Sequence, residues 1–169
     1  MLATGIGQQY ALLLRELAPI INELYLYYSK EVNDAVAEKG KNVLNYMTIK
    51  TMRSIKKEVI KIYLKYLEKC TNLNNDQASY ILDTFIFPLG NLLKDFQECM
   101  PETKEQEFVA LFTAVLEKLH RVINPTFLSN LLDMIFSSSL PLITTDFNSF
   151  PEIRANFFSF LKALIKYNF

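Results

Sequence analysis

Hydrophobic residues recur at steps of three and four along most of the chain, the spacing that places them on one face of an α-helix. In the first segment this spacing runs from Tyr10 to Tyr28 and predicts a helix over about residues 7–39. Pro19 lacks the N–H that its own backbone hydrogen bond needs, so a kink is expected there. Gly40 is expected to end the helix in a left-handed cap conformation.

The same spacing predicts five further helices. They cover about residues 46–69, 77–98, 102–123, 127–146 and 151 to the end. Pro88 and Pro141 fall inside two of them and predict kinks. These six helices form three predicted hairpins, at about residues 7–70, 76–123 and 126–169.

Two turns in the chain resemble each other. Asp95 is followed by Pro101 and a new helix, and Asp146, 51 residues further on, is followed by Pro151 and another. Hairpins that repeat every 40 to 50 residues or so are typical of HEAT-type solenoids. The fold expected is therefore an all-α, alpha-alpha superhelix of about three HEAT-type hairpins, and a six-helix bundle is the alternative.

Composition narrows the classes of partner. The chain has 169 residues, half of them hydrophobic, and 18 basic residues balance 18 acidic ones. A neutral chain has no overall field that favours nucleic acid, and its uninterrupted apolar runs are too short for a membrane span. Cys70 and Cys99 do not form a CxxC pair, so neither a disulfide nor a zinc site is indicated. We expect no metal and no cofactor.

The second predicted helix is strongly amphipathic. Its expected apolar face is Ile49, Met52, Ile55, Val59, Ile62, Tyr66 and Cys70, and its opposite face is Lys50, Arg53, Lys57, Lys61 and Lys65. Two interpretations are open for the basic face. It is either an ordinary solvated face or an electropositive patch that contacts a partner, with Arg53 and Lys57 as the best candidates, and an acidic neighbour would offset its self-repulsion.

The acidic residues between Asp95 and Glu107 are expected to be helix-end charges and turn solubilisers. The single histidine, His120, has no Ser or Cys partner in a recognisable motif, so no enzyme is indicated. Phe157 and Phe158 are neighbours on a helix and cannot face the same core, because adjacent residues differ by about 100°. One is expected to pack within its own repeat and the other to face the next repeat.

Three blocks of sequence resemble the C-terminal half of the exportin-1 family of nuclear export receptors. They are residues 50–58, residues 87–102 with Phe87-Pro88-Leu89 and Asp95-Phe96, and residues 146–158. The third is the most specific, because eight of its positions match the family's pattern in order. The blocks follow the family's order and cover about residues 10–164, as a piece of a longer receptor truncated at both ends.

The resemblance implies a scaffold of the importin-beta/karyopherin superfamily that shuttles between nucleus and cytoplasm. Such receptors bind leucine-rich-signal cargo and Ran-GTP together and touch nucleoporins, while the export-signal groove lies outside the region resembled. In the family the second helix of each hairpin lines the concave side, which would place Lys50, Arg53, Lys57 and Lys61 against partners. The alternatives are an unrelated HEAT-type adaptor and a helical-bundle ligand-binding protein or enzyme.

The turn residues Asp95, Asp146, Pro151 and Arg154 are expected to be structural. Pro151 suits the first position of a helix, where its missing N–H is harmless. Asp146 and Arg154 are expected to bond each other or the neighbouring repeat and so to stabilise the last hairpin turn.

Overall fold

The computed structural model describes residues 2–86, 89–145 and 150–168, and within these ranges it contains seven α-helices and no β-strand. The helices are α1 (Leu2–Lys39), α2 (Met47–Lys69), α3 (Asn75–Ile81), α4 (Gly90–Glu98), α5 (Glu107–Leu119), α6 (Pro125–Thr145) and α7 (Pro151–Asn168). Three short segments join them: the 3-10 helix η1 (Lys41–Asn45), the π-helical turn η2 (Leu82–Ile86) and the 3-10 turn η4 (Pro101–Thr103).

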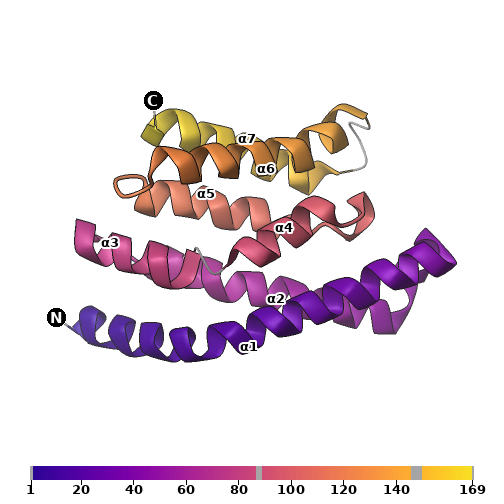
Figure 1. Ribbon diagram of the computed structural model, residues 1–169, viewed down its shortest axis with the longest axis horizontal. Helices are drawn as coiled ribbons and strands as arrows, with labels where there is room; N and C mark the ends of the chain where they lie inside the picture. The colour runs from indigo at the N-terminus through magenta and orange to yellow at the C-terminus, as the bar shows by residue number, and fades with distance from the viewer. Residues whose placement is uncertain (1, 87–88, 146–149, 169) are drawn as a thin grey trace.

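The helices are stacked in successive layers (Figure 1). Helix α1 packs against α2 at one edge of the stack, α2 packs against α5, and α5 packs against α7 at the other edge. Helix α4 contacts both α1 and α6. Helices α1, α4 and α6 therefore form one row, and α2, α5 and α7 form a second. This two-row arrangement confirms the predicted all-α superhelix of HEAT type, while its division into repeats at residues 7–70, 76–123 and 126–169 stays a prediction.

One large hydrophobic core runs through the stack. Its largest fully buried aromatic side chains are Tyr25, Tyr63, Phe85, Phe96, Phe108, Phe112 and Phe160. Tyr25 and Phe108 meet edge to face with ring centroids 5.6 Å apart, a geometry that aromatic pairs prefer. Phe157 is 3% exposed and Phe158 is 58% exposed, so the two neighbours face different surroundings, as predicted.

The third predicted helix is divided in two, contrary to expectation. Asn74 caps α3, because its Oδ1 accepts from the backbone N–H of Gln77 over 2.8 Å and the Gln77 side chain accepts in return. The π-helical turn η2 follows and buries Phe85, and α4 begins only at Gly90. Pro88, the predicted kink, lies outside the described residues.

The fourth predicted helix begins five residues late, at Glu107, and ends at Leu119. Pro101 opens the short 3-10 turn η4 instead, and Lys104 then has an extended backbone with φ −67° and ψ 131°. This extension lets the side chains of Lys104 and Glu105 turn inward, where they are 8% and 1% exposed. Interactions of these buried side chains replace the helical hydrogen bonds that were expected.

The other helices begin and end close to their predicted positions. Helix α1 starts earlier than expected and continues through Pro19, which lies on its exposed side. Gly40 ends it with a φ of 77°, as expected of a glycine stop, but its ψ of 177° differs from the left-handed cap. Its N–H donates to the carbonyl of Val36 over 2.9 Å.

Helix α6 is long enough and apolar enough to cross a membrane, judged by length and composition alone. The sequence had not indicated this, because only uninterrupted apolar runs were considered there. Length and composition are weak support for insertion, because a helix packed inside a protein meets the same criterion. Here α6 contacts α4 and α7 and buries Leu131, Ile135 and Leu142.

Candidate functional site

The basic residues of α2 do not share one solvent-facing side. Lys50 is exposed, while Arg53 and Lys57 are half-buried where α2 meets the start of α5. Lys61 pairs with Glu58 on its own helix, with 2.8 Å between Nζ and Oε1. The predicted face is thus divided between solvent and an internal seam.

The buried face of α2 is also rotated from its predicted position. The residues that it buries are Ile49, Lys56, Val59, Ile60, Tyr63 and Leu67. Ile55, Ile62 and Tyr66, which were expected at its centre, are only partly buried. The reason is that α2 packs against α1 on one side and α5 on the other, so a wider sector of the helix is covered than one apolar stripe.

Glu105 organises the seam between α2 and α5. Arg53 donates from Nε to one carboxylate oxygen over 2.9 Å and from Nη2 to the other over 3.3 Å, a bidentate pairing. The Nζ of Lys57 lies 3.6 Å from the second oxygen and 4.0 Å from Glu107 Oε1. Because Glu105 is 1% exposed, its charge would be costly without these cations. Glu105 therefore holds α2 and the residues before α5 together by ion pairs. The sequence had instead predicted a solvent-exposed charge in a turn.

Lys56 is a cation inside the core. Its side chain is 0% exposed, its Nζ donates to the carbonyl of Thr103 over 3.4 Å, and it lies 5.2 Å from the centroid of the Tyr25 ring. Burial lowers the pKa of Lys56, and the charge of Glu105 opposes that shift. Lys56 therefore joins α2 to η4 from within.

Lys104 is the second interior cation. Its Nζ donates to the carbonyl of Phe96 and, over 3.0 Å, to that of Gln97, near the C-terminal end of α4. A cation at this end of a helix is favoured, because the last carbonyls carry partial negative charge. Burial lowers the pKa of Lys104.

A polar network connects this seam to α1. Ser29 donates from its hydroxyl to Asp95 Oδ2 over 2.7 Å, and Asn33 Oδ1 accepts from the Thr103 hydroxyl over 2.8 Å and from the Met100 N–H over 3.2 Å. Asp95 was predicted as a turn residue, and the structure places it in α4, facing α1. The network therefore fixes α1, α4 and η4 together.

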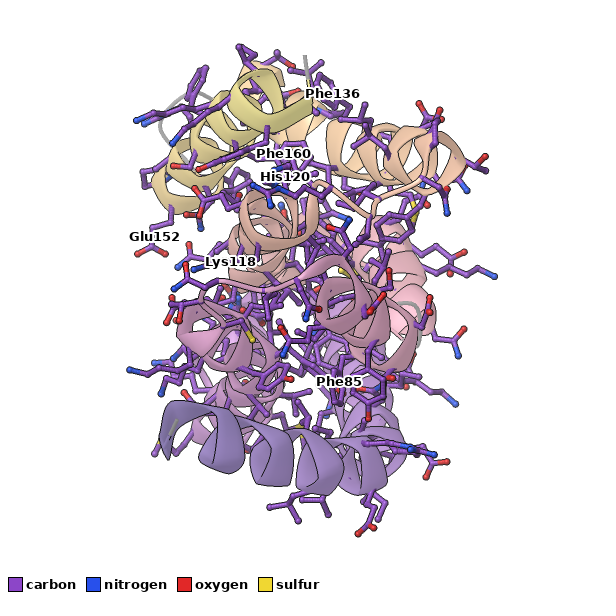
Figure 2. All side chains as sticks on the ribbon, turned by 90° about the vertical axis from the view of Figure 1, so that its left-hand side faces the viewer. Phe85, Lys118, His120, Phe136, Glu152 and Phe160 are labelled. Atoms are coloured by element: carbon purple, nitrogen blue, oxygen red, sulfur yellow. The ribbon has the colours of Figure 1, made fainter. Side chains whose placement is uncertain are left out.

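A cleft of about 180 Å³ opens beside the seam. Its walls include Arg53 and Lys57 of α2, Glu102 of η4, and Pro151 and Glu152 of α7. The structure thus brings two predicted basic residues next to one predicted turn residue. Figure 2 shows Glu152 reaching outward from the side of the stack.

The remaining turn residues lie near α7. Arg154 is in its first turn and donates its backbone N–H to the carbonyl of Phe150 over 3.0 Å. Asp146 lies outside the described residues. The proposed bond between Asp146 and Arg154 therefore stays a prediction.

His120 and the acidic residues were the remaining candidates for chemistry in the sequence. No group of three or more His, Cys, Asp or Glu side chains among them could hold a metal ion. His120 follows the end of α5 and stacks on Tyr167 of α7, with ring centroids 4.9 Å apart.

Comparison with known proteins decides the family. The family described as CRM1 C terminal matches residues 16–169, nearly the whole chain. The chain belongs to the CRM1 C-terminal family. This membership sets it apart from unrelated HEAT-type adaptors.

Relatives of this CRM1 C-terminal chain are similar along most of its length. It is 28% identical to Protein EXPORTIN 1B of Arabidopsis thaliana over 147 residues, which cover 86% of this chain and 13% of that protein. It is 28% identical to Exportin-1 of Dictyostelium discoideum over 83% of this chain and 12% of the relative. For Exportin-1 of Drosophila melanogaster the identity is 27%, over 95% of this chain and 15% of the relative. The chain thus spans only a small part of the length of these relatives.

Sequence reasoning missed Lys56, Lys104 and Glu105 as the residues that connect the helices. Lys56 and Lys57 are adjacent, and charge alone gives no sign that one faces the core and the other the edge. The available signal was position: Lys56 lies three residues before Val59 and four before Ile60, so it shares their helical face.

Proposed function

We propose that this chain is a protein-binding segment of a nuclear export receptor. The receptor carries cargo with leucine-rich signals out of the nucleus together with Ran-GTP, touches nucleoporins and shuttles between nucleus and cytoplasm. The observation that carries the proposal is the CRM1 C-terminal match over residues 16–169, supported by similarity to proteins named exportin-1. The chain works by binding, without a chemical step or cofactor.

The segment serves as scaffold and does not contain the export-signal groove. Its two rows of helices form stacked layers whose edges present side chains to large partners, as solenoids do. The cleft of about 180 Å³ beside the seam is smaller than the roughly 300–1,000 Å³ of small-molecule sites, and a second cleft of about 320 Å³, lined by Pro19, Asn22 and Leu92 among others, reaches only the lower limit of that range. A partner surface is therefore a better ligand for this segment than a small molecule.

Partner contact is proposed at the edge of α2, through Lys50, Arg53, Lys57 and Lys61. Lys50 is exposed, and no ion pair of its side chain occurs within the described residues. Arg53 and Lys57 keep 25% and 33% of their side chains exposed at the cleft although both pair with Glu105. An acidic partner side chain would meet Lys50 first and the outer atoms of the other cations next.

The test uses the complete gene product that contains these residues. A fluorescent leucine-rich signal peptide is titrated with it in the presence of Ran-GTP or Ran-GDP, and fluorescence anisotropy reports binding. We expect tight binding with Ran-GTP and a loss of at least tenfold with Ran-GDP. Equal binding under both conditions would contradict the export-receptor proposal.

A charge reversal tests the α2 edge separately. Lys50→Glu is expected to weaken the Ran-GTP complex by about threefold to tenfold, the size expected for an exposed interfacial charge. Lys162→Glu, an exposed lysine of α7, is the matched control. If both variants bind like the wild type, the α2 edge is not the contact, and the receptor proposal still stands on the first experiment.

A further inference from the structure

Four of the seven helices described above carry a lysine in the last turn: Lys39 of α1, Lys69 of α2, Lys118 of α5 and Lys166 of α7. The negative partial charge at the C-terminal end of a helix favours each of them singly. It does not explain how they are distributed. Helices α2, α5 and α7 run in one direction and α1 runs in the other, so Lys39 lies on one side of the stack and the other three lie on the opposite side (Figure 1).

Contacts between the helix ends bring these three lysines close together. The ring of His120 stacks on that of Tyr167 with centroids 4.9 Å apart, and the Nζ of Lys166 lies 4.7 Å from the centroid of the same tyrosine ring. Burial raises the pKa of the Cys70 thiol and the charge of Lys118 opposes that rise, so the end of α2 lies beside the end of α5. Figure 2 views this side of the stack, with Lys118 and His120 on it.

The gathered cations are open to solvent. Arg121, two residues beyond the end of α5, joins the three lysines, and we call these four residues the basic edge. Lys69, Arg121 and Lys166 are exposed, and Lys118 is half-buried. None of the four takes part in an ion pair within the described part of the chain. Unlike Arg53, which is held by Glu105, these cations are therefore available to an external anion.

The spacing of the basic edge indicates the shape of an anionic partner. Helix α2 packs against α5, and α5 packs against α7. Packed helices lie roughly 8–10 Å apart, so three layers spread the cations over about 20 Å. An extended chain advances about 3.3 Å per residue, so carboxylates three residues apart repeat at about the interval of the layers. An extended acidic segment of about seven residues therefore reaches all three.

Two carboxylates on this side favour a spaced row of anions over a continuous one. Glu68 and Glu117 are exposed next to Lys69 and Lys118 in the sequence. Phosphates follow one another at about 3.4 Å along a nucleic acid strand, so such a row would meet both carboxylates. An acidic segment with spaced side chains can place its charges between them. The chain as a whole has no net charge, so no wider field would hold a nucleic acid.

We propose that the basic edge binds an extended acidic segment of a partner protein, whose carboxylates, about three residues apart, meet α2, α5 and α7 in turn. This surface is separate from the α2 edge around Lys50 and Arg53, because it lies at the opposite end of α2. The inference does not depend on the export proposal, since it uses only the charges and packing of this chain.

An NMR titration tests the proposal on the 169-residue chain labelled with 15N. The probe is a seven-residue peptide with glutamate at its first, fourth and seventh positions and Gly-Ser between them. At about 50 mM salt we expect a weak complex with a Kd of about 1 mM or below, and amide shifts confined to the last turns of α2, α5 and α7 and the residues just after them. A peptide with its three glutamates adjacent should bind about threefold more weakly, because it reaches one layer only.

Charge reversals identify the surface. Lys118→Glu and Lys166→Glu should each weaken peptide binding about threefold to tenfold. Lys39→Glu is the matched control, because it also reverses an exposed, unpaired lysine in the last turn of a helix, but on the other side of the stack. It should leave the affinity unchanged. Circular dichroism checks that each variant is folded.

Four results would each overturn the proposal. The first is an absence of shifts at the basic edge with several millimolar peptide, and the second is equal affinity for the spaced and the adjacent glutamates. The third is a loss of affinity in Lys39→Glu as large as that in Lys118→Glu. The fourth is a single-stranded DNA of seven nucleotides that binds the same residues more tightly than the peptide, which would make this side a nucleic acid site.

Discussion

Replacing Glu105 by glutamine is expected to destabilise the chain by about 2–4 kcal/mol. The carboxylate is 1% exposed and joins Arg53 and Lys57 of α2 to the residues just before α5. Glutamine has nearly the same size, so the change removes the charge without leaving a cavity. Removing one partner of a buried pair costs about 3–5 kcal/mol, and the lower limit applies because Arg53 and Lys57 still reach water with 25% and 33% of their side chains.

Urea unfolding measures the free energy and thermal unfolding measures the melting temperature, both followed by circular dichroism at 222 nm. For a chain of this size each kcal/mol corresponds to roughly 2–4 °C, so the melting temperature should fall by about 5–15 °C. Glu58→Gln is the matched control, because Glu58 pairs with Lys61 on the exposed side of the same helix. Exposed pairs of this kind contribute little.

A double-variant cycle makes the test specific. If the pairing is the cause, Arg53→Gln in the Glu105→Gln background should cost about 1–3 kcal/mol less than in the wild type, because the partner is already lost. The reasoning would be refuted if the Glu105→Gln variant unfolded at the same urea concentration as the Glu58→Gln variant. So would strict additivity of the two changes.

Other variants test other parts of the fold. Phe157→Ala should cost about 3–5 kcal/mol by leaving a cavity in the core, while Phe158→Ala, at an exposed neighbour, should change stability little; similar melting temperatures would contradict the assignment of these faces. Tyr63→Phe should cost about 1 kcal/mol, because it removes a hydrogen bond of 2.9 Å to an asparagine of α1. Burial raises the pKa of Tyr63 from 10.0 to about 12, so its stabilisation is complete below pH 10 and is lost as the pH rises towards 12. In Tyr63→Phe that alkaline loss should be smaller, as measured by urea unfolding across this range, and an unchanged slope would argue against it. Asp146→Ala should lower the melting temperature by about 2–4 °C if Asp146 stabilises the last hairpin turn, and an unchanged value would contradict that role.

Periodicity in the sequence was sufficient for the fold and for most helix ends. The boundaries of α2, α6 and α7 follow from apolar spacing and from turn residues such as Pro125 and Pro151. Neither the division between α3 and α4 nor the late start of α5 could be predicted from this spacing. The π-helical turn at Leu82–Ile86 keeps its apolar residues buried while it changes the number of residues per turn, and a count of hydrophobic positions does not register that change.

The candidate site was less predictable because it depends on contacts between distant residues. Arg53 and Glu105 are 52 residues apart, and their pairing requires both the α2–α5 packing and the late start of α5. Local rules assign a glutamate between a proline turn and a helix to solvent. Only the three-dimensional path of residues 101–107, a 3-10 turn followed by the extended Lys104 and then by the start of α5, makes Glu105 an interior ligand for two cations.

The pairing of Arg53 and Lys57 with Glu105 limits how much these two cations can contribute to binding an acidic partner at α2. An acidic partner that engaged these cations fully would have to draw them away from a carboxylate that is 1% exposed, and a buried charge left without its partner is strongly unfavourable. Such a partner would therefore lose most of the energy that it gained. Lys50 pairs with no carboxylate among the described residues, so charge recognition at this edge should depend mainly on Lys50, with Arg53 and Lys57 shaping the cleft. Mutating Arg53 would then reduce stability before it reduced affinity, and Lys50→Glu would do the reverse.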